Sequence, residues 1–163
     1  ALQSLGIEGA GLKWPNDVLA GRDKLAGVLI DVVGEASGPC AVIVGVGINM
    51  DLPDDKSRAI DQSWTDLRRV SGDAVLSRNE LAGRVLSELI PVMELFEREG
   101  LQPFLDDWRR YDLVSGRRVD LQLPNERISG TACGIDDGGA LLVHTREGRR
   151  RFLSGDVSLR VAS

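Results

Sequence analysis

The stretch Lys13-Trp14-Pro15-Asn16-Asp17 is followed by Lys24-Leu25-Ala26-Gly27 and then by Gly45-Val46-Gly47-Ile48-Asn49. The polar and glycine residues of these three segments interrupt long apolar runs. A buried ligand finds its few directional contacts at such places. The spacing therefore predicts a ligand site built on the strands that surround the three segments.

The apolar runs around these segments predict strands. Residues 25–33 and 41–48 are rich in Val, Leu and Ile, and turn residues from Gly34 to Pro39 separate them. Continuous apolar runs of this length are typical of strands buried on both faces, so we expect a buried hairpin. A shorter strand is expected at residues 11–14, before Pro15, which lacks an amide donor.

Helical patterns follow in the middle of the chain. Trp64, Leu67 and Val70 predict a short amphipathic helix. Residues 78–99 predict a longer one, with Ser77 and Glu80 as a capping box. Its expected inward face consists of Leu81, Val85, Leu89, Val92 or Met93, and Phe96. Gly100 should end this helix, and Pro103 should open another with Phe104, Leu105 and Trp108 facing inward.

The last third of the chain has the pattern of a small β-barrel. Short strands are expected at residues 117–123, 127–135, 140–145, 149–153 and 158–161, with turn residues between them. A unit of this size is near the lower limit for independent stability, so it should lean on the preceding domain. We therefore expect an α+β fold with one domain at 1–112 and the barrel at 113–163.

Composition excludes some classes of function. The chain has 163 residues, of which 42% are hydrophobic, enough for a real core. Its net charge of −5 argues against a broad nucleic-acid surface. No apolar run reaches the roughly 20 residues of a membrane span. Cys40 and Cys133 both lie in apolar segments, which predicts buried, reduced thiols and a cytoplasmic location.

Each candidate site residue has a structural interpretation as an alternative to ligand binding. Gly45, Gly47 and Asn49 alternate along a strand and could form a smooth floor for a flat ligand, or allow close packing against a helix. Lys24 could neutralise a phosphate or carboxylate, or stay solvated. Asn16 and Asp17 at a strand end could contact a ligand or simply form a turn.

Two further features are interpreted as structural. His144 has no cysteine or second histidine at metal-ligand spacing, so we expect no zinc site. The run Arg149-Arg150-Arg151 is interpreted as a solvated hairpin arm rather than a phosphate site, because charge runs usually mark solvated surface.

Taken together, the three segments resemble biotin protein ligases, enzymes that activate biotin with ATP and attach it to a lysine of a carrier protein. The segments occur in the family's order and spacing. The tail, with Gly134-Ile135-Asp136, Gly139-Ala140-Leu141-Leu142 and 155–160 (Gly-Asp-Val-Ser-Leu-Arg), resembles the family's C-terminal SH3-like barrel. The resemblance extends along essentially the whole chain.

The resemblance implies a role for each site residue. Lys24 would contact the biotin carboxylate and the α-phosphate, and Asp17 would lie near the acyl phosphate and help with metal or with the incoming lysine amine. The biotin pocket would include Gly27 and Gly45, and the nucleotide would be held by Asn16, Asn49 and Arg160. ATP and biotin would be the substrates, with Mg²⁺ accompanying ATP and no metal site of the protein's own.

The chain departs from the family upstream of Lys13. Family members carry a Gly-Arg-Gly-Arg-type loop there, and nothing before Lys13 matches it. Gly116-Arg117-Arg118 and Gly148-Arg149-Arg150 open barrel strands, so we reject them as substitutes. We therefore expect the C-terminal part of a catalytic domain plus the barrel, weakly active or inactive alone because apolar surface is left uncovered. The DNA-binding helix-turn-helix of some members is missing as well.

Alternatives to biotin ligation stay open. A lipoate ligase or lipoyl transferase shares the fold and the two-step logic, although the Lys-Trp-Pro-Asn-Asp string favours biotin. A non-catalytic docking or dimerisation module is the alternative from another class. The partner that the resemblance implies is the biotin carboxyl carrier protein of acetyl-CoA carboxylase. A homodimer is open, and neither a membrane nor nucleic acid is expected as a partner.

Overall fold

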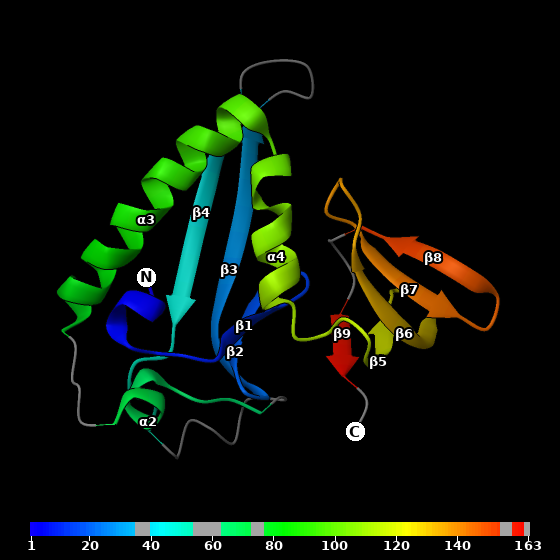
Figure 1. Cartoon of the computed structure of the whole chain (residues 1–163), viewed down its shortest axis with the longest axis horizontal. Helices are drawn as coiled ribbons and strands as arrows, with labels where there is room; N and C mark the ends of the chain where they lie inside the picture. Colours follow the sequence, from blue (N-terminus) through cyan, green and yellow to red (C-terminus); the bar gives the residue numbers. More distant parts are fainter. Residues whose placement is uncertain (35–39, 54–62, 73–76, 154–157, 162–163) are drawn as a thin grey trace.

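Two antiparallel sheets form the framework of the molecule (Figure 1). The computed structural model describes residues 1–34, 40–53, 63–72, 77–153 and 158–161. A long helix and several short ones accompany the sheets, and helix α4 (Leu105–Tyr111) lies between the two sheets in Figure 1. The α+β class expected from the sequence is confirmed.

The first sheet has the strand order β1-β2-β3-β4. Its strands are β1 (Ala10–Lys13), β2 (Asp17–Ala20), β3 (Asp23–Gly34) and β4 (Cys40–Ile48), after the short 3-10 helix η1 (Gln3–Leu5). The expected early strand and the β3–β4 hairpin are confirmed. Strand β2 was not expected, because its apolar segment is short and Asn16 and Asp17 read as a turn. The expected turn at 34–39 lies mostly outside the described residues.

The expectation that the hairpin is buried on both faces is wrong for the described chain. Large apolar side chains of both strands are exposed: Leu29, Ile30, Val32 and Val33 of β3, and Val42, Ile43 and Val46 of β4. Strand β4 is an edge of its sheet, and the described residues place no second layer over these side chains. An apolar run predicts a strand suited to burial, but it does not supply the element that covers it.

The helices are α2 (Leu67–Ser71), α3 (Arg78–Glu99), η2 (Gln102–Phe104) and α4 (Leu105–Tyr111). Ser77 caps α3, since its hydroxyl accepts a hydrogen bond of 3.2 Å from the amide of Glu80. Gly100 follows α3 with a φ of 67°, a conformation that favours glycine. The predicted end of the long helix and the helix opened by Pro103 are therefore confirmed.

Two expectations about the helices are wrong. The short helix begins at Leu67, so Trp64 precedes it, and Val70 is exposed. On α3, Leu81 is buried and the next two residues of the expected face are half-buried, but Val92, Met93 and Phe96 are exposed. Periodicity predicts an apolar stripe, and the described residues cover only its first turns.

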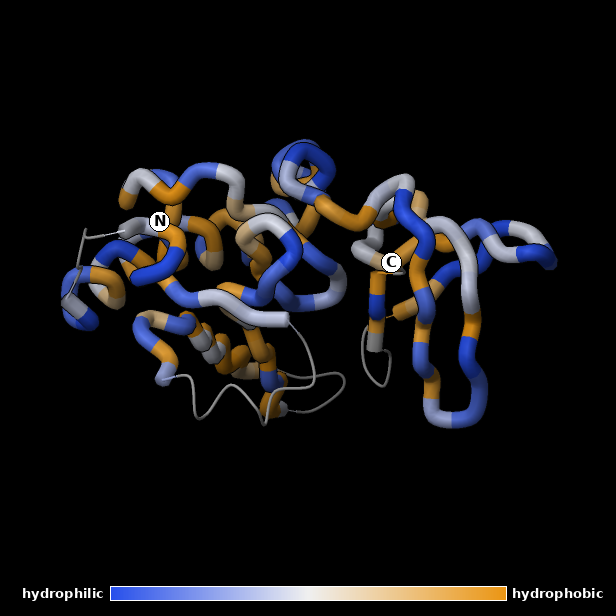
Figure 2. The backbone as a smooth tube through the Cα atoms, turned by 90° about the horizontal axis from the view of Figure 1, so that it is seen from below, coloured by the Kyte–Doolittle hydropathy of each residue, from blue (hydrophilic) through white to orange (hydrophobic). Residues whose placement is uncertain are grey.

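The second sheet has the strand order β8-β7-β6-β5-β9. Its strands are β5 (Arg118–Gln122), β6 (Arg127–Ile135), β7 (Leu141–Thr145), β8 (Gly148–Phe152) and β9 (Ser158–Val161), all close to the expected ranges. Hydrophobic and hydrophilic residues are intermixed along this C-terminal part of the chain (Figure 2). The alternation buries one side chain in two, as at Val119 and Leu121, and so creates a core on one face.

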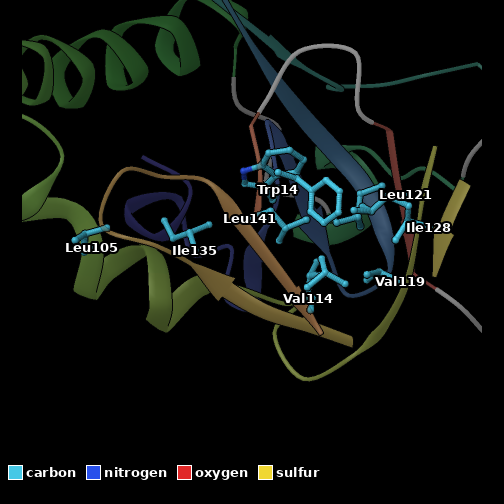
Figure 3. Packing of buried hydrophobic residues seen from close by; sticks show 12 residues of the cluster. Trp14, Leu105, Val114, Val119, Leu121, Ile128, Ile135 and Leu141 are labelled. Atoms are coloured by element: carbon cyan, nitrogen blue, oxygen red, sulfur yellow. The ribbon is translucent and has the colours of Figure 1, made fainter. Parts of the chain in front are cut away.

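The second sheet shares its core with the first part of the chain. Trp14 and Leu105 belong to the same buried cluster as Leu121 and Leu141, and Figure 3 shows Trp14 among the side chains of this cluster. The indole Nε1 of Trp14 donates a hydrogen bond of 3.2 Å to the carbonyl of Gly139. The expectation that this small unit packs on the preceding part of the chain is confirmed.

The expectation of buried cysteines is wrong. Cys40 and Cys133 are free thiols, and both are exposed. Cys40 is the first residue of the edge strand β4, and Cys133 lies between positions of β6 that face the core. An apolar neighbourhood in sequence does not decide which face of a strand a side chain takes. No helix in the described ranges is long and apolar enough to cross a membrane.

Candidate functional site

A row of paired residues crosses the first sheet. Lys13 of β1 is paired with Asp17 of β2, Asp17 with Gly27 of β3, and Gly27 with Gly47 of β4. Residues paired across an antiparallel sheet point to the same face. The sheet therefore places two charged side chains beside two positions that have no side chain.

Asp17 is the centre of the charged part of this row. One of its carboxylate oxygens accepts a hydrogen bond of 2.8 Å from Lys13 Nζ, and the other is in contact with Lys24 Nζ. The Asp17 side chain is 10% exposed, that of Lys13 12%, and that of Lys24 31%. The cluster of Lys13, Asp17 and Lys24 thus carries one net positive charge, and Lys24 is its most accessible member.

The two lysines control the protonation of Asp17. Burial by itself raises the pKa of this carboxyl group. Hydrogen bonds from Lys13 and Lys24, together with their positive charges, outweigh burial and hold the pKa of Asp17 below its ordinary value. Asp17 is therefore a carboxylate at neutral pH.

The glycines leave space beside this cluster. A Cβ atom at Gly27 would lie 3.3 Å from both Cε and Nζ of Lys24. Within 4 Å, a Cβ at Gly45 would meet only the carbonyl oxygen of Leu29 at 3.6 Å, and a Cβ at Gly47 only that of Gly27 at 3.9 Å. In the described part of the chain, no side chain packs onto either glycine of β4, which fits the expected smooth floor.

Asn49 follows β4 and holds the backbone around Lys24. Its Nδ2 donates to the carbonyls of Lys24 at 3.2 Å and Thr65 at 2.9 Å. The amide of Thr65 in turn donates to the carbonyl of Lys24 at 3.0 Å. The donors of the Asn49 side chain thus fix protein backbone, and its Oδ1 faces no partner among the described residues.

The other two candidate residues lie in different places. Asn16 lies between β1 and β2, where its side chain is exposed and its carbonyl accepts a hydrogen bond of 2.9 Å from Val28 N. Arg160 lies on β9, opposite Asp120 of β5, in the second sheet. The first sheet and its edge therefore carry Lys24, Asp17, Gly27, Gly45, Asn16 and Asn49, whereas Arg160 comes from the second sheet.

One residue of this site and one residue beside it were not predicted as such. Lys13 is in the quoted motif, but only the pairing of β1 with β2 shows that it faces Asp17. Asp66 is 1% exposed and accepts hydrogen bonds from Arg69 N at 2.9 Å and Leu52 N at 3.1 Å. Its position just before α2 is the signal for an N-cap.

The residues interpreted as structural lie on the second sheet. Arg150 pairs with Glu126 at 3.2 Å, and Arg151 pairs with Asp136. His144 is exposed on β7. Arg149 and Arg151 are exposed, which supports the interpretation of the arginine run as a solvated arm.

The described residues do not fit a resident metal ion. They contain no group of three or more His, Cys, Asp and Glu side chains that could hold one. Both oxygens of Asp17 are already engaged by lysines. The arrangement suits an anion instead: a positive cluster next to an open, flat strand surface can bind a negatively charged group that is joined to a flat one.

Comparison with known families and proteins agrees with this geometry. Residues 2–49 match the "Biotin/lipoate A/B protein ligase family", and residues 114–160 match the "Biotin protein ligase C terminal domain". The bifunctional ligase/repressor BirA of Escherichia coli K12 is 35% identical over 161 residues, which are 99% of this chain and 50% of that protein. The biotin--[acetyl-CoA-carboxylase] ligase of Mycobacterium tuberculosis is 38% identical over 150 residues, 90% of this chain and 52% of that protein.

Solved structures of biotin protein ligase from Aquifex aeolicus share the fold. The apo structure superimposes with a TM-score of 0.81 at 30% identity and covers 99% of this chain and 69% of that chain. A complex of the same protein with biotin and ATP gives a TM-score of 0.80 at 30% identity, with 99% and 66% covered. This chain spans about half the length of the curated relatives it matches. The chain belongs to the biotin protein ligase family.

Proposed function

We propose that the whole protein containing this chain activates biotin with ATP to biotinyl-5′-AMP and transfers biotin to a lysine of a biotin carboxyl carrier protein. The observation that supports this most is the contact of Lys24 with Asp17 next to the glycine positions of β3 and β4. It places an accessible cation beside an open surface, as joining an anionic acid to a nucleotide requires.

The roles of the residues follow from their placement. Lys24 would offset negative charge as an oxygen of the biotin carboxylate attacks the α-phosphorus and pyrophosphate leaves. A unit pair at about 4 Å contributes roughly 4 kcal/mol at an effective dielectric of about 20. Gly27 and Gly45 would leave room for biotin, and Asp17 would keep Lys24 in place until the anions arrive.

The nucleotide would be held by three residues. The Nδ2 of Asn49 already donates to two backbone carbonyls, so its Oδ1 is the atom that would contact the nucleotide, as a hydrogen-bond acceptor. Asn16 is exposed at the strand end, and Arg160 would reach the phosphates from the second sheet. In the second step, the carrier lysine amine attacks the acyl carbon and AMP leaves. Positioning supplies much of the rate in such reactions.

The finer assignments belong to the same proposal. We assign residues 1–112 to the catalytic domain and 113–163 to an SH3-like barrel. Mg²⁺ would arrive bound to the phosphates of ATP, as part of the substrate. The location would be cytoplasmic, the carrier would be that of acetyl-CoA carboxylase, and a homodimer is compatible with the exposed edge strand β4.

The choice of acid tests the proposal against its closest rival. The whole protein should catalyse exchange of labelled pyrophosphate into ATP in the presence of biotin, and much less with lipoate. Exchange that depends on lipoate rather than biotin would assign the protein to lipoate activation.

Titration calorimetry with biotinyl-5′-AMP tests the alternative that the protein is a non-catalytic docking module. No heat of binding for the adenylate, together with retained binding of the carrier protein, would favour that alternative.

A further inference from the structure

The geometry points to Lys13 as a positioning residue for adenylate formation: by remaining on Asp17, it allows Lys24 to leave that carboxylate for the anionic substrates. This inference rests on the proposed function, because it concerns the same site. Lys13 is not among the candidate residues to which the proposed function gives a role.

Asp17 divides its two oxygens between two lysines. Lys13 Nζ binds Oδ2 at 2.8 Å, and Lys24 Nζ contacts Oδ1. The two lysines come from β1 and β3, on opposite sides of β2. Each ammonium group therefore occupies its own oxygen, and either can leave without displacing the other.

The two lysines differ in access. The side chain of Lys13 is 12% exposed, whereas that of Lys24 is 31% exposed. The end of Lys24 lies over Gly27, where a Cβ atom would be 3.3 Å from its Cε and Nζ. Gly27 gives the end of Lys24 space in which to move. Lys13 is the member of the pair suited to stay in place.

A buried carboxylate needs at least one partner. Removing the only partner of a buried charge is strongly destabilising, because the charge is then neither solvated nor paired. If Lys24 were the sole partner of Asp17, each move of Lys24 toward substrate would leave Asp17 unpaired. With Lys13 present, one ion pair persists, so Lys24 can be transferred at lower free-energy cost.

This role predicts that the effect of substituting Lys13 depends on whether Asp17 carries a charge. In the whole protein, Lys13→Met should lower the rate of biotin-dependent pyrophosphate exchange and the affinity for biotinyl-5′-AMP. In an Asp17→Asn background no carboxylate requires a partner, so the same substitution should have little further effect. We expect the two effects to differ by about tenfold, within the range of coupling between contacting charged residues.

Further variants separate charge from folding. Lys13→Arg keeps the charge and should retain most of the affinity, whereas Lys13→Gln keeps a hydrogen-bond donor without charge and should behave like Lys13→Met. Arg68→Met is the matched control, because Arg68 pairs at 2.7 Å with Asp51 on the surface, where both side chains are more than half exposed. Thermal unfolding of each variant checks that it is folded.

The outcomes distinguish the inference from the function on which it rests. If the unaltered protein shows neither exchange nor adenylate binding, the proposed function is wrong and the inference falls with it. If the unaltered protein is active but Lys13→Met acts equally in both backgrounds, or has no effect, Lys13 does not position Lys24 and the inference alone is overturned. Adenylate affinity gives this answer even where Asp17→Asn abolishes turnover.

Discussion

At the scale of single residues, Asp17 makes the protein sensitive to acid. An unfolded aspartate has a pKa of about 3.9, and the pKa of native Asp17 is lower. Its ion pairs thus contribute fully above about pH 4 and are lost as the pH falls through the native pKa.

Asp17→Asn should therefore lower the unfolding free energy at pH 7 by about 2 kcal/mol, as for loss of hydrogen bonds between charged groups. That difference from the unaltered protein should be smaller at about pH 3, which lies below the unfolded pKa, and should vanish only at pH values below the native pKa of Asp17. Urea unfolding at the two pH values measures it. Asp106→Asn is the control, since that carboxylate is 98% exposed and should contribute little at either pH. A difference for Asp17→Asn that stays constant with pH would contradict the account.

Gly27 is the residue at which added volume should affect function more than stability. A Cβ at 3.3 Å from Lys24 Cε and Nζ forces the end of this flexible side chain to shift. Gly27→Ala should therefore reduce biotin-dependent exchange severalfold while the melting temperature stays nearly unchanged. Gly83→Ala on α3 is the control: its Cβ meets nothing within 4 Å, so the rate should be unaffected and the helix slightly more stable. Equal rates for both variants would show that the space beside Lys24 is not used.

The sequence could predict some of these residues and not others. Lys24 and Asp17 were candidates from their motifs, but their contact depends on the pairing of β2 with β3, including the shift in register at Val18 and Leu19. Lys13 could not be identified without the pairing of β1 with β2. The hydrogen bond from Asn49 Nδ2 to the carbonyl of Thr65 could not be predicted either, because Thr65 is distant in sequence.

At the scale of elements, Trp14 links the first sheet to the second. It continues directly from β1, yet its ring lies in the core of the second sheet and donates to Gly139. Trp14→Phe should cost about 2 kcal/mol of unfolding free energy, because the hydrogen bond is lost and the smaller phenyl ring leaves unfilled space in the core. Trp14→Ala should cost roughly 3–5 kcal/mol. Chemical denaturation measures both.

Trp64→Phe is the matched control for Trp14→Phe. Trp64 is half-buried and stacks with Arg69, 4.2 Å from the ring centre, away from the core of the second sheet. It should change stability less than Trp14→Phe. If the two variants lowered stability equally, the contact of Trp14 with the second sheet would be no more important for stability than the contact of Trp64 with Arg69.

Element boundaries were predictable where the local chemistry is strong. Ser77 and Gly100 define α3, and turn residues separate the strands of the second sheet. Strand β2 was missed because a strand of four residues gives little periodicity. The apolar Trp64 suggests an earlier start for the short helix, but Asp66 caps it, so the helix begins at Leu67.

At the scale of the whole molecule, the apolar side chains of β3, β4 and α3 are exposed. The family resemblance predicts uncovered apolar surface, but the sequence pattern does not predict that these strands and this helix carry it. Burial depends on what covers a face, and a local pattern does not contain that information. The exposed residues include Leu29 and Val32 of β3 and Val42 of β4. Both strands are long, and β4 is an open edge of the sheet. Such surfaces favour association.

The 163-residue chain taken alone should therefore self-associate as its concentration rises and show little ligase turnover. Replacing Leu29, Val32 and Val42 together by Lys should reduce this association, because charges oppose contact between apolar strands. Sedimentation velocity measures it over a range of concentrations. A monodisperse monomer at every concentration, or turnover equal to that of the whole protein, would show that these faces need no cover.

The central claim is that Lys24 provides the positive charge for joining biotin to the nucleotide. Its most direct test is the rate of biotin-dependent pyrophosphate exchange by the Lys24→Ala variant of the whole protein, with Arg68→Ala as the surface control. The account predicts a loss of at least about 10²-fold, as for removal of one preorganised donor, and an unchanged rate for the control. A near-normal rate for folded Lys24→Ala would contradict it.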